Sequence, residues 1–68
     1  MVILKSHMVL NSDTIGTLAE YLGISRQTLS GRMNGRSRFK LKEIMMIADR
    51  YRLDSDAIVE IFLKEELH

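Results

Sequence analysis

The sequence contains no cysteine and only two histidines, His7 and the terminal His68. Neither disulfides nor thiolate zinc ligands can therefore stabilise the fold, and we expect no metal site and no cofactor. Long apolar runs are absent too: the longest, residues 44–48, is far shorter than the roughly 20 residues that span a bilayer. Residues 1–4 are too few for a signal-peptide core. These absences predict a cytoplasmic protein that has no membrane partner and is held together by packing.

The chain is also too short to enclose a deep substrate cavity, because 68 residues form a single small domain. It contains no nucleophile, base and acid set and no glycine-rich phosphate loop. We therefore expect no enzyme activity and no small-molecule substrate. Hydrophobic residues at 46% and charged residues at 28% are typical of an ordinary folded globular domain.

Acidic residues are missing from residues 26–42, where six basic residues occur: Arg26, Arg32, Arg36, Arg38, Lys40 and Lys42. Residues 54–68 show the opposite bias, with five acids against Lys64. One side of the molecule should therefore attract a polyanion, and another should not. The alternative is that these charges only keep a small domain in solution.

Residues 15–34 have the pattern of two short helices joined by a tight turn. Leu18 and Leu22 lie four residues apart on one helical face, and Leu29 and Met33 repeat that spacing. Between them, a glycine at Gly23 can adopt the left-handed conformation that ends a helix. The pattern predicts a helix-turn-helix motif.

Two further residues support this motif. Ser25 can cap the second helix, because its hydroxyl accepts a hydrogen bond from a free amide of the first turn. Ala19, one turn before Gly23, carries only a methyl group and lets the second helix cross close to the first.

The same periodicity predicts three more helices, over residues 2–11, 41–51 and 55–63, so the fold class is expected to be a compact all-α bundle of five helices in one domain. Thr14 or Asp13 can cap the helix over residues 15–22, and Asp54 or Ser55 the last one. The helix over residues 41–51 is expected to bury Leu41, Ile44, Met45, Ile47, Ala48 and Tyr51 and to expose Lys42, Glu43, Asp49, Arg50 and Arg52.

The outer face of the second motif helix follows from its buried one. If Leu29 and Met33 point inward, the outward residues are Gln27, Ser30, Gly31 and Asn34, with Arg26 at the leading end. Arginine can pair with guanine and glutamine with adenine, each pair discriminating by about 1 to 3 kcal/mol. The candidate base-reading residues are Arg26, Gln27, Ser30 and Gly31. Two interpretations of Gly31 remain open: it allows close approach to a base, or it only weakens the helix.

Contacts to the DNA backbone are expected on either side of this helix. After it, Arg36, Arg38 and Lys40 can reach phosphates while Phe39 turns into the core, although an aromatic among basic residues can instead stack on single-stranded bases. Before it, Thr17 can offer its hydroxyl or amide to a phosphate at the amino end of its helix, or can make local bonds only.

The last helix is rich in large apolar residues for a terminal element. We expect part of its face to be exposed and to join two subunits, and the candidate dimer residues are Ile58, Ile61, Phe62 and Leu63, together with Leu67. Closure of a small core is the alternative.

The motif residues resemble those of the Cro and repressor type of helix-turn-helix domain, the xenobiotic-response-element-like (XRE) family, over about residues 4–62. The matching pattern is Leu18-Ala19-x-x-Leu22-Gly23-Ile24-Ser25-x-x-Thr28-Leu29-Ser30-x-x-x-Asn34-Gly35, then Phe39, Glu43-Ile44, Ile47-Ala48 and Tyr51-x-Leu53. The resemblance implies base contacts for Arg26, Gln27 and Gly31. It implies phosphate or sugar contacts for Thr17, Ser25, Thr28 and Asn34. Two departures are Arg32, where many members have an apolar residue, and Gly31, where a longer side chain often reads a base.

The sequence therefore predicts a small transcriptional repressor of phage or bacterial type that binds double-stranded DNA, as a homodimer on a two-fold symmetric operator. The alternative is a protein-interaction module on the same fold, an antirepressor or antitoxin, which binds a protein partner through the terminal helix.

Overall fold

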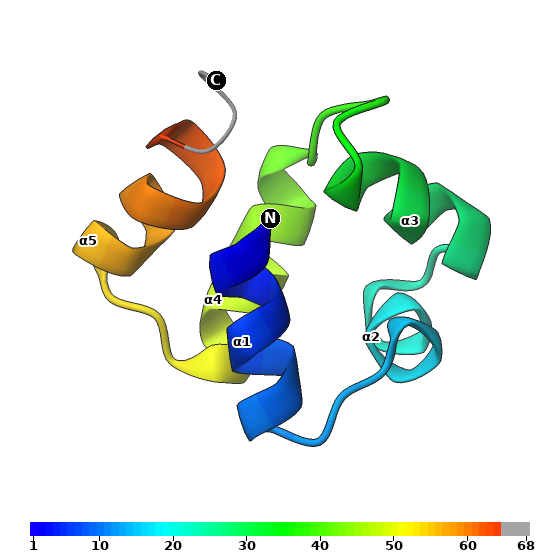
Figure 1. The fold of residues 1–68 in the computed structure, drawn as a ribbon, viewed down its shortest axis with the longest axis horizontal. Coiled ribbons are helices and arrows are strands. Elements are labelled where there is room, and N and C mark those ends of the chain that lie inside the picture. The colour runs from blue at the N-terminus through cyan, green and yellow to red at the C-terminus, as the bar shows by residue number, and fades with distance from the viewer. Residues whose placement is uncertain (65–68) are drawn as a thin grey trace.

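The computed structural model describes residues 1–64, which form five α-helices and a terminal π-helical segment (Figure 1). In chain order these are α1 (Val2–Leu10), α2 (Ile15–Leu22), α3 (Arg26–Met33), α4 (Leu41–Tyr51), α5 (Ser55–Ile58) and η1 (Val59–Lys64). Figure 1 shows α2 and α3 on one side of α1 and α4, and α5 on the other. The predicted all-α class with five helices is confirmed, and no strand occurs within residues 1–64.

The turn between α2 and α3 is short, and both of its ends are capped. Gly23 ends α2 in the left-handed conformation, with φ 72°, and Ile24 donates its amide hydrogen to the Ala19 carbonyl at 3.0 Å. Ser25 begins α3, and its Oγ accepts from the amide of Thr28 at 3.0 Å. At the other end of α2, Thr14 is the capping residue. These caps were expected from the sequence, and they set α3 at an angle to α2.

The core draws side chains from helices α1 to α4, from the loop before α4 and from η1. Its members are Leu4, Met8, Leu18, Ala19, Leu22, Leu29, Met33, Phe39, Ile47, Tyr51, Ile61 and Phe62. The rings of Phe39 and Phe62 meet edge to face, with centroids 5.3 Å apart. Phe39 is therefore a core residue, which favours core filling over base stacking.

The buried face of α4 differs from the prediction. Glu43 is only 5% exposed, whereas Leu41 and Met45 are 73% and 63% exposed. The core stripe of α4 runs at a spacing of four through Glu43, Ile47 and Tyr51. The prediction placed Glu43 outside because it is charged; it is inside because Arg32 reaches it from α3.

The dimer prediction for the last helix is also corrected in part. Ile61 and Phe62 are 0% and 1% exposed, so they close the core of this chain and are not available to a second subunit. Ile58 is half-buried and Leu63 is 56% exposed. Leu67 lies outside the described residues. Closure of the core therefore explains most of the apolar content of the terminal segment.

Candidate nucleic-acid interface

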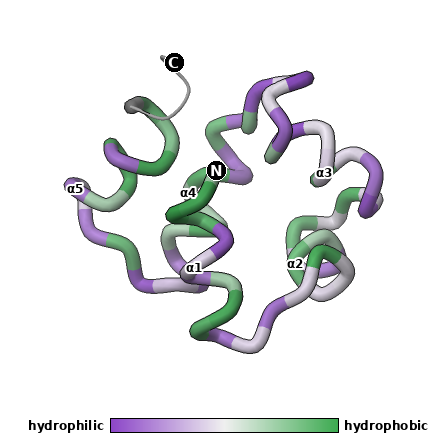
Figure 2. Tube along the Cα trace, in the orientation of Figure 1, coloured by the Kyte–Doolittle hydropathy of each residue, from purple (hydrophilic) through white to green (hydrophobic). Residues whose placement is uncertain are grey.

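One face of α3 is packed and the opposite face is polar. Leu29 and Met33 are buried, whereas Arg26 and Gln27 at the amino end are exposed and Ser30 and Gly31 are half-buried further along. Asn34, at the carboxyl end, is exposed as well. In Figure 2, most of α3 and of the loop after it is hydrophilic or neutral in colour. The four candidate base-reading residues therefore lie on the accessible side of one helix.

Two hydroxyl groups at the start of α3 form a pair. The Oγ atom of Ser25 accepts from the Thr28 amide and donates to Thr28 Oγ1 at 2.8 Å. Each hydroxyl has one hydrogen, and the bond between the two hydroxyls uses one of them, so one hydrogen of the pair remains for an outside acceptor. Ser25 and Thr28, both predicted phosphate contacts, therefore offer one donor between them to a phosphate oxygen.

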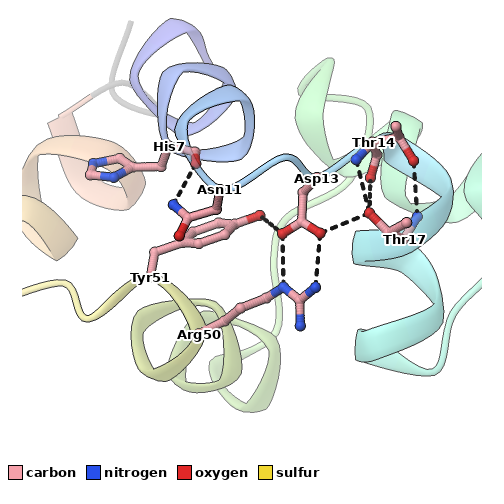
Figure 3. Close-up of polar contacts among 7 residues, drawn as sticks. All are labelled: His7, Asn11, Asp13, Thr14, Thr17, Arg50 and Tyr51. Atoms are coloured by element: carbon pink, nitrogen blue, oxygen red, sulfur yellow. Dashed lines mark hydrogen bonds and ion pairs between the residues drawn. The ribbon is translucent and has the colours of Figure 1, made fainter.

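Thr17, a predicted phosphate contact, has its donors committed to local bonds (Figure 3). Its amide donates to Thr14 Oγ1 at 3.1 Å, and its hydroxyl donates to Asp13 Oδ1 at 2.7 Å while accepting from the Thr14 amide. A phosphate oxygen only accepts hydrogen bonds, so Thr17 has no donor left for it. The geometry favours the alternative of local bonds only.

The loop between α3 and α4 carries the predicted phosphate contacts of the basic segment. Arg36, Arg38 and Lys40 are exposed, while Phe39 between them is buried. The amides of Arg36 and Ser37 both donate to the Gly31 carbonyl, at 2.9 and 3.4 Å, which holds the loop against the end of α3. Asn34 ends α3, and its side-chain amide lies 3.4 Å from Ser30 Oγ. These positively charged side chains therefore follow directly on the accessible face of α3.

Arg32 does not belong to the exposed basic surface. Its Nε and Nη2 donate to the two carboxylate oxygens of Glu43 at 2.6 and 3.2 Å, and its Nη1 donates to Ser37 Oγ at 3.0 Å. Glu43 Oε1 also accepts from the Lys40 amide at 2.9 Å. We call these four residues the Arg32 clamp. They join α3, the basic loop and α4.

The charges in the Arg32 clamp are largely out of water, with the two side chains 11% and 6% exposed. Burial alone would raise the pKa of Glu43, but the hydrogen bonds from Arg32 and from the Lys40 amide outweigh it and hold the pKa below its usual value. Five exposed basic side chains between residues 26 and 42 make no ion pair within residues 1–64: Arg26, Arg36, Arg38, Lys40 and Lys42.

A second polar cluster lies where the loop before α2 meets α4 (Figure 3). The Asp13 carboxylate, 4% exposed, accepts from Arg50 Nε and Nη2, both at 2.8 Å, from the Tyr51 hydroxyl at 2.7 Å and from Thr17 Oγ1. We call these four residues the Asp13 cluster. The Arg50 guanidinium also lies over the Tyr21 ring, 4.5 Å from its centroid. The cluster holds the start of α2 against α4.

These contacts move the pKa values of the cluster. The hydrogen bonds from Arg50, followed by those from Tyr51 and Thr17, hold the pKa of Asp13 far below its usual value despite burial. Burial and the bond to Asp13 raise the pKa of the Tyr51 hydroxyl well above its usual value. From the sequence, Arg50 was expected only as an outward residue of its helix and Asp13 only as a possible cap. No spacing rule relates residues 37 positions apart, so only the structure reveals this pair.

Other kinds of site find little support in residues 1–64. No group of three or more potential metal-ligating side chains comes together there. None of the helices in that part of the chain has the length and apolar character needed to cross a membrane. An open groove of about 850 Å³ runs along α4, where it is lined by apolar side chains such as Leu41, Met45 and Ile58 and by the charged Asp49, Arg52 and Asp54.

A short capped turn, a helix with a buried apolar back and a polar front, and a basic loop beside it together define a DNA-binding helix-turn-helix domain. A family model described as helix-turn-helix matches residues 8–58, three quarters of the chain. The chain belongs to this family, the Cro/XRE type of DNA-binding transcription regulators. Comparisons with curated proteins and with solved structures gave no match.

Proposed function

We propose that this protein is a sequence-specific transcriptional repressor that reads double-stranded DNA with α3. The observation that carries the proposal is the two-sided character of α3, whose back is anchored by Leu29 and Met33 and whose front is polar and slim. Such a helix can enter the major groove with its amino end toward the base edges. Bound at a promoter, the protein represses by occupying it.

Base contacts come from the outer face of α3, with the two longest side chains at its amino end. Arg26 and Gln27 are exposed and long enough to pair with guanine and adenine edges, respectively. Ser30 lies one turn further along. At Gly31, a Cβ atom would meet only Ser37 Oγ, at 3.9 Å, so the open space there allows a base or a thymine methyl group to approach the backbone closely.

Phosphate contacts fix the register of α3 on the duplex. Arg36, Arg38 and Lys40 supply them from the loop. Neutral donors come from the Ser25–Thr28 hydroxyl pair at the start of α3 and from Asn34 at its end. Such contacts add affinity without sequence information.

Two copies bind one operator in this proposal, because dimeric helix-turn-helix proteins place two recognition helices on half-sites about 34 Å apart. With Ile61 and Phe62 in the core, Ile58 and Leu63 are the remaining candidates in the terminal segment. The exposed Leu41 and Met45 of α4 extend the apolar surface available to a second copy.

Selection of bound sites from random DNA tests the proposal directly, and it should yield a pseudo-palindromic site. On that site, Arg26→Ala should reduce affinity about tenfold or more and leave binding to random DNA nearly unchanged. Arg38→Ala should weaken binding to both DNAs and lower the slope of log affinity against log salt by about 1.

The outcomes separate the alternatives. Equal losses of Arg26→Ala on the selected site and on random DNA would remove Arg26 from base reading. No DNA affinity even at low salt, together with capture of a protein partner, would favour the interaction module.

A further inference from the structure

Gly16 occupies a position in α2 where a glycine is unexpected. It lies in the first turn of the helix, and its φ is not among the positive values that would require glycine. Glycine makes a helix less stable than alanine does, because it loses more backbone freedom on folding. A reason for glycine at this position must therefore be sought in space, not in backbone conformation.

That space is filled by the side chain of Arg26. A Cβ atom added to Gly16 would lie 2.9 Å from Nη2, 3.0 Å from Nε and 3.1 Å from Cζ of Arg26. All three atoms belong to the guanidinium group, which therefore rests on the backbone of α2. At the other three glycines of the chain, an added Cβ would come no closer than 3.9 Å to any such neighbour.

The side chain that makes this contact, Arg26, has no charged partner within residues 1–64. Arg26 is exposed, and within residues 1–64 it makes no ion pair with a carboxylate. It is the first residue of α3 and the longest side chain at the amino end of that helix. Its guanidinium therefore lies where the start of α3 meets the first turn of α2.

We propose that Gly16 is a positioning residue: the missing side chain seats the Arg26 guanidinium against α2 and so presents it to the DNA. A Cβ at this position displaces the far end of a flexible side chain and leaves the core intact. Gly16→Ala therefore moves Arg26 without unfolding α2. The inference rests on the proposed function for its effect on DNA, but the seat itself is a property of the free protein.

The test uses Gly16→Ala, Arg26→Ala and the double variant in the full chain. Gly16→Ala should have a Tm at or above that of the wild type and bind the selected DNA site about tenfold more weakly. In the Arg26→Ala background, the same substitution should cause no further loss of affinity. Unchanged affinity in Gly16→Ala, an equal loss in both backgrounds, or a lower Tm would each overturn the proposal.

A second measurement keeps this test distinct from that of the proposed function. In the free protein, the NMR signal of the Arg26 Nε–H group should shift in Gly16→Ala, because its neighbour changes. An unshifted signal overturns the seat whether or not DNA binds. Failure of the wild type to bind any DNA at low salt overturns the proposed function, and the NMR shift then decides by itself whether Arg26 is seated on Gly16.

Discussion

Both helices of the motif are tied to α4 by a carboxylate paired with a guanidinium, yet the two ties differ in what they connect. In the Asp13 cluster, the carboxylate comes from the loop before α2, and both Arg50 and Tyr51 come from α4. In the Arg32 clamp, the arginine belongs to α3 itself and also holds Ser37 of the basic loop. The first tie anchors the scaffold, whereas the second also anchors the DNA-binding loop.

The difference shows why similar ion pairs need not have similar functions. Breaking the Asp13 cluster removes no contact to the basic loop, and the capping box of Thr14 and Thr17 still holds the first turn of α2, so the effect should be mainly on stability. Breaking the Arg32 clamp should affect stability and also the placement of the side chains that reach phosphate. Three predictions test that division.

A large loss of stability is expected from Asp13→Asn. The Asp13 carboxylate accepts four hydrogen bonds, and the neutral amide, which has one acceptor oxygen, keeps at most two of them. Loss of two hydrogen bonds to a charged group costs about 3 kcal/mol of the free energy of unfolding. A domain of this size has a total of only roughly 3 to 10 kcal/mol, so urea unfolding should begin at much lower denaturant.

Asp49→Asn is the matched control, because Asp49 is an exposed carboxylate on the same helix as Arg50. It should change stability by no more than about 0.5 kcal/mol. At a temperature where Asp13→Asn is still folded, the affinity of that variant for the selected DNA site should stay within about twofold of the wild type. A large loss of DNA affinity in Asp13→Asn would show that the Asp13 cluster also supports DNA binding.

The second prediction concerns acid. Because the pKa of Asp13 is lower in the folded state than in the unfolded chain, the unfolded state binds more protons at low pH. The stabilisation is complete above about pH 4 and is lost as pH falls toward the pKa of the folded state, by up to about 1.4 kcal/mol for each pH unit.

Urea unfolding at several pH values between about 6 and 2.5 measures this loss, and Asp13→Asn should flatten the acid limb. Glu43→Gln should flatten the acid limb less. Burial raises the pKa of Glu43 and so offsets much of the lowering that the hydrogen bonds from Arg32 and the Lys40 amide cause. Equal flattening by the two variants would mean that folding lowers the pKa values of Asp13 and Glu43 by the same amount, which would contradict this prediction.

The fold could be predicted from the sequence because its signals are local. The spacing of Leu18, Leu22, Leu29 and Met33 and the caps at Gly23 and Ser25 are readable within one or two turns of helix. The two ties could not be predicted, because each joins residues of different elements, and the Arg32 clamp also buries Glu43, whose charge favoured an exposed position. Glu43 was expected outside and Leu41 inside for that reason, and Arg32 was counted with the basic surface that it does not join.

The candidate site divides in the same way. Which residues of α3 face outward follows from helical periodicity, so Arg26, Gln27 and Asn34 were expected where they lie. Thr17 and Gly16 depend on neighbours. The amide and the hydroxyl of Thr17 donate hydrogen bonds to Thr14 and Asp13. Gly16 lies against the guanidinium of Arg26, which is ten residues away in the sequence. Contacts of this kind leave no periodic trace in the sequence.

The smallest effect on stability is expected when both charges of the Arg32 clamp are replaced. Arg32→Met alone leaves the Glu43 carboxylate buried without its partner and should cost about 3 kcal/mol of stability. Arg32→Met combined with Glu43→Leu removes both charges, and apolar pairs of similar volume commonly match a buried ion pair in stability. The double variant should therefore unfold at nearly the denaturant concentration of the wild type.

Its DNA binding should nevertheless be weaker by about fivefold, roughly 1 kcal/mol, because the bond from Arg32 to Ser37 and the bond from the Lys40 amide to Glu43 no longer hold the loop. The loss should be equal on the selected site and on random DNA, since the loop contacts phosphates and not bases. Gel-shift titrations on both DNAs measure it. If the double variant is stable and binds as the wild type does, the clamp only supports the fold, and the two ties differ in position but not in role.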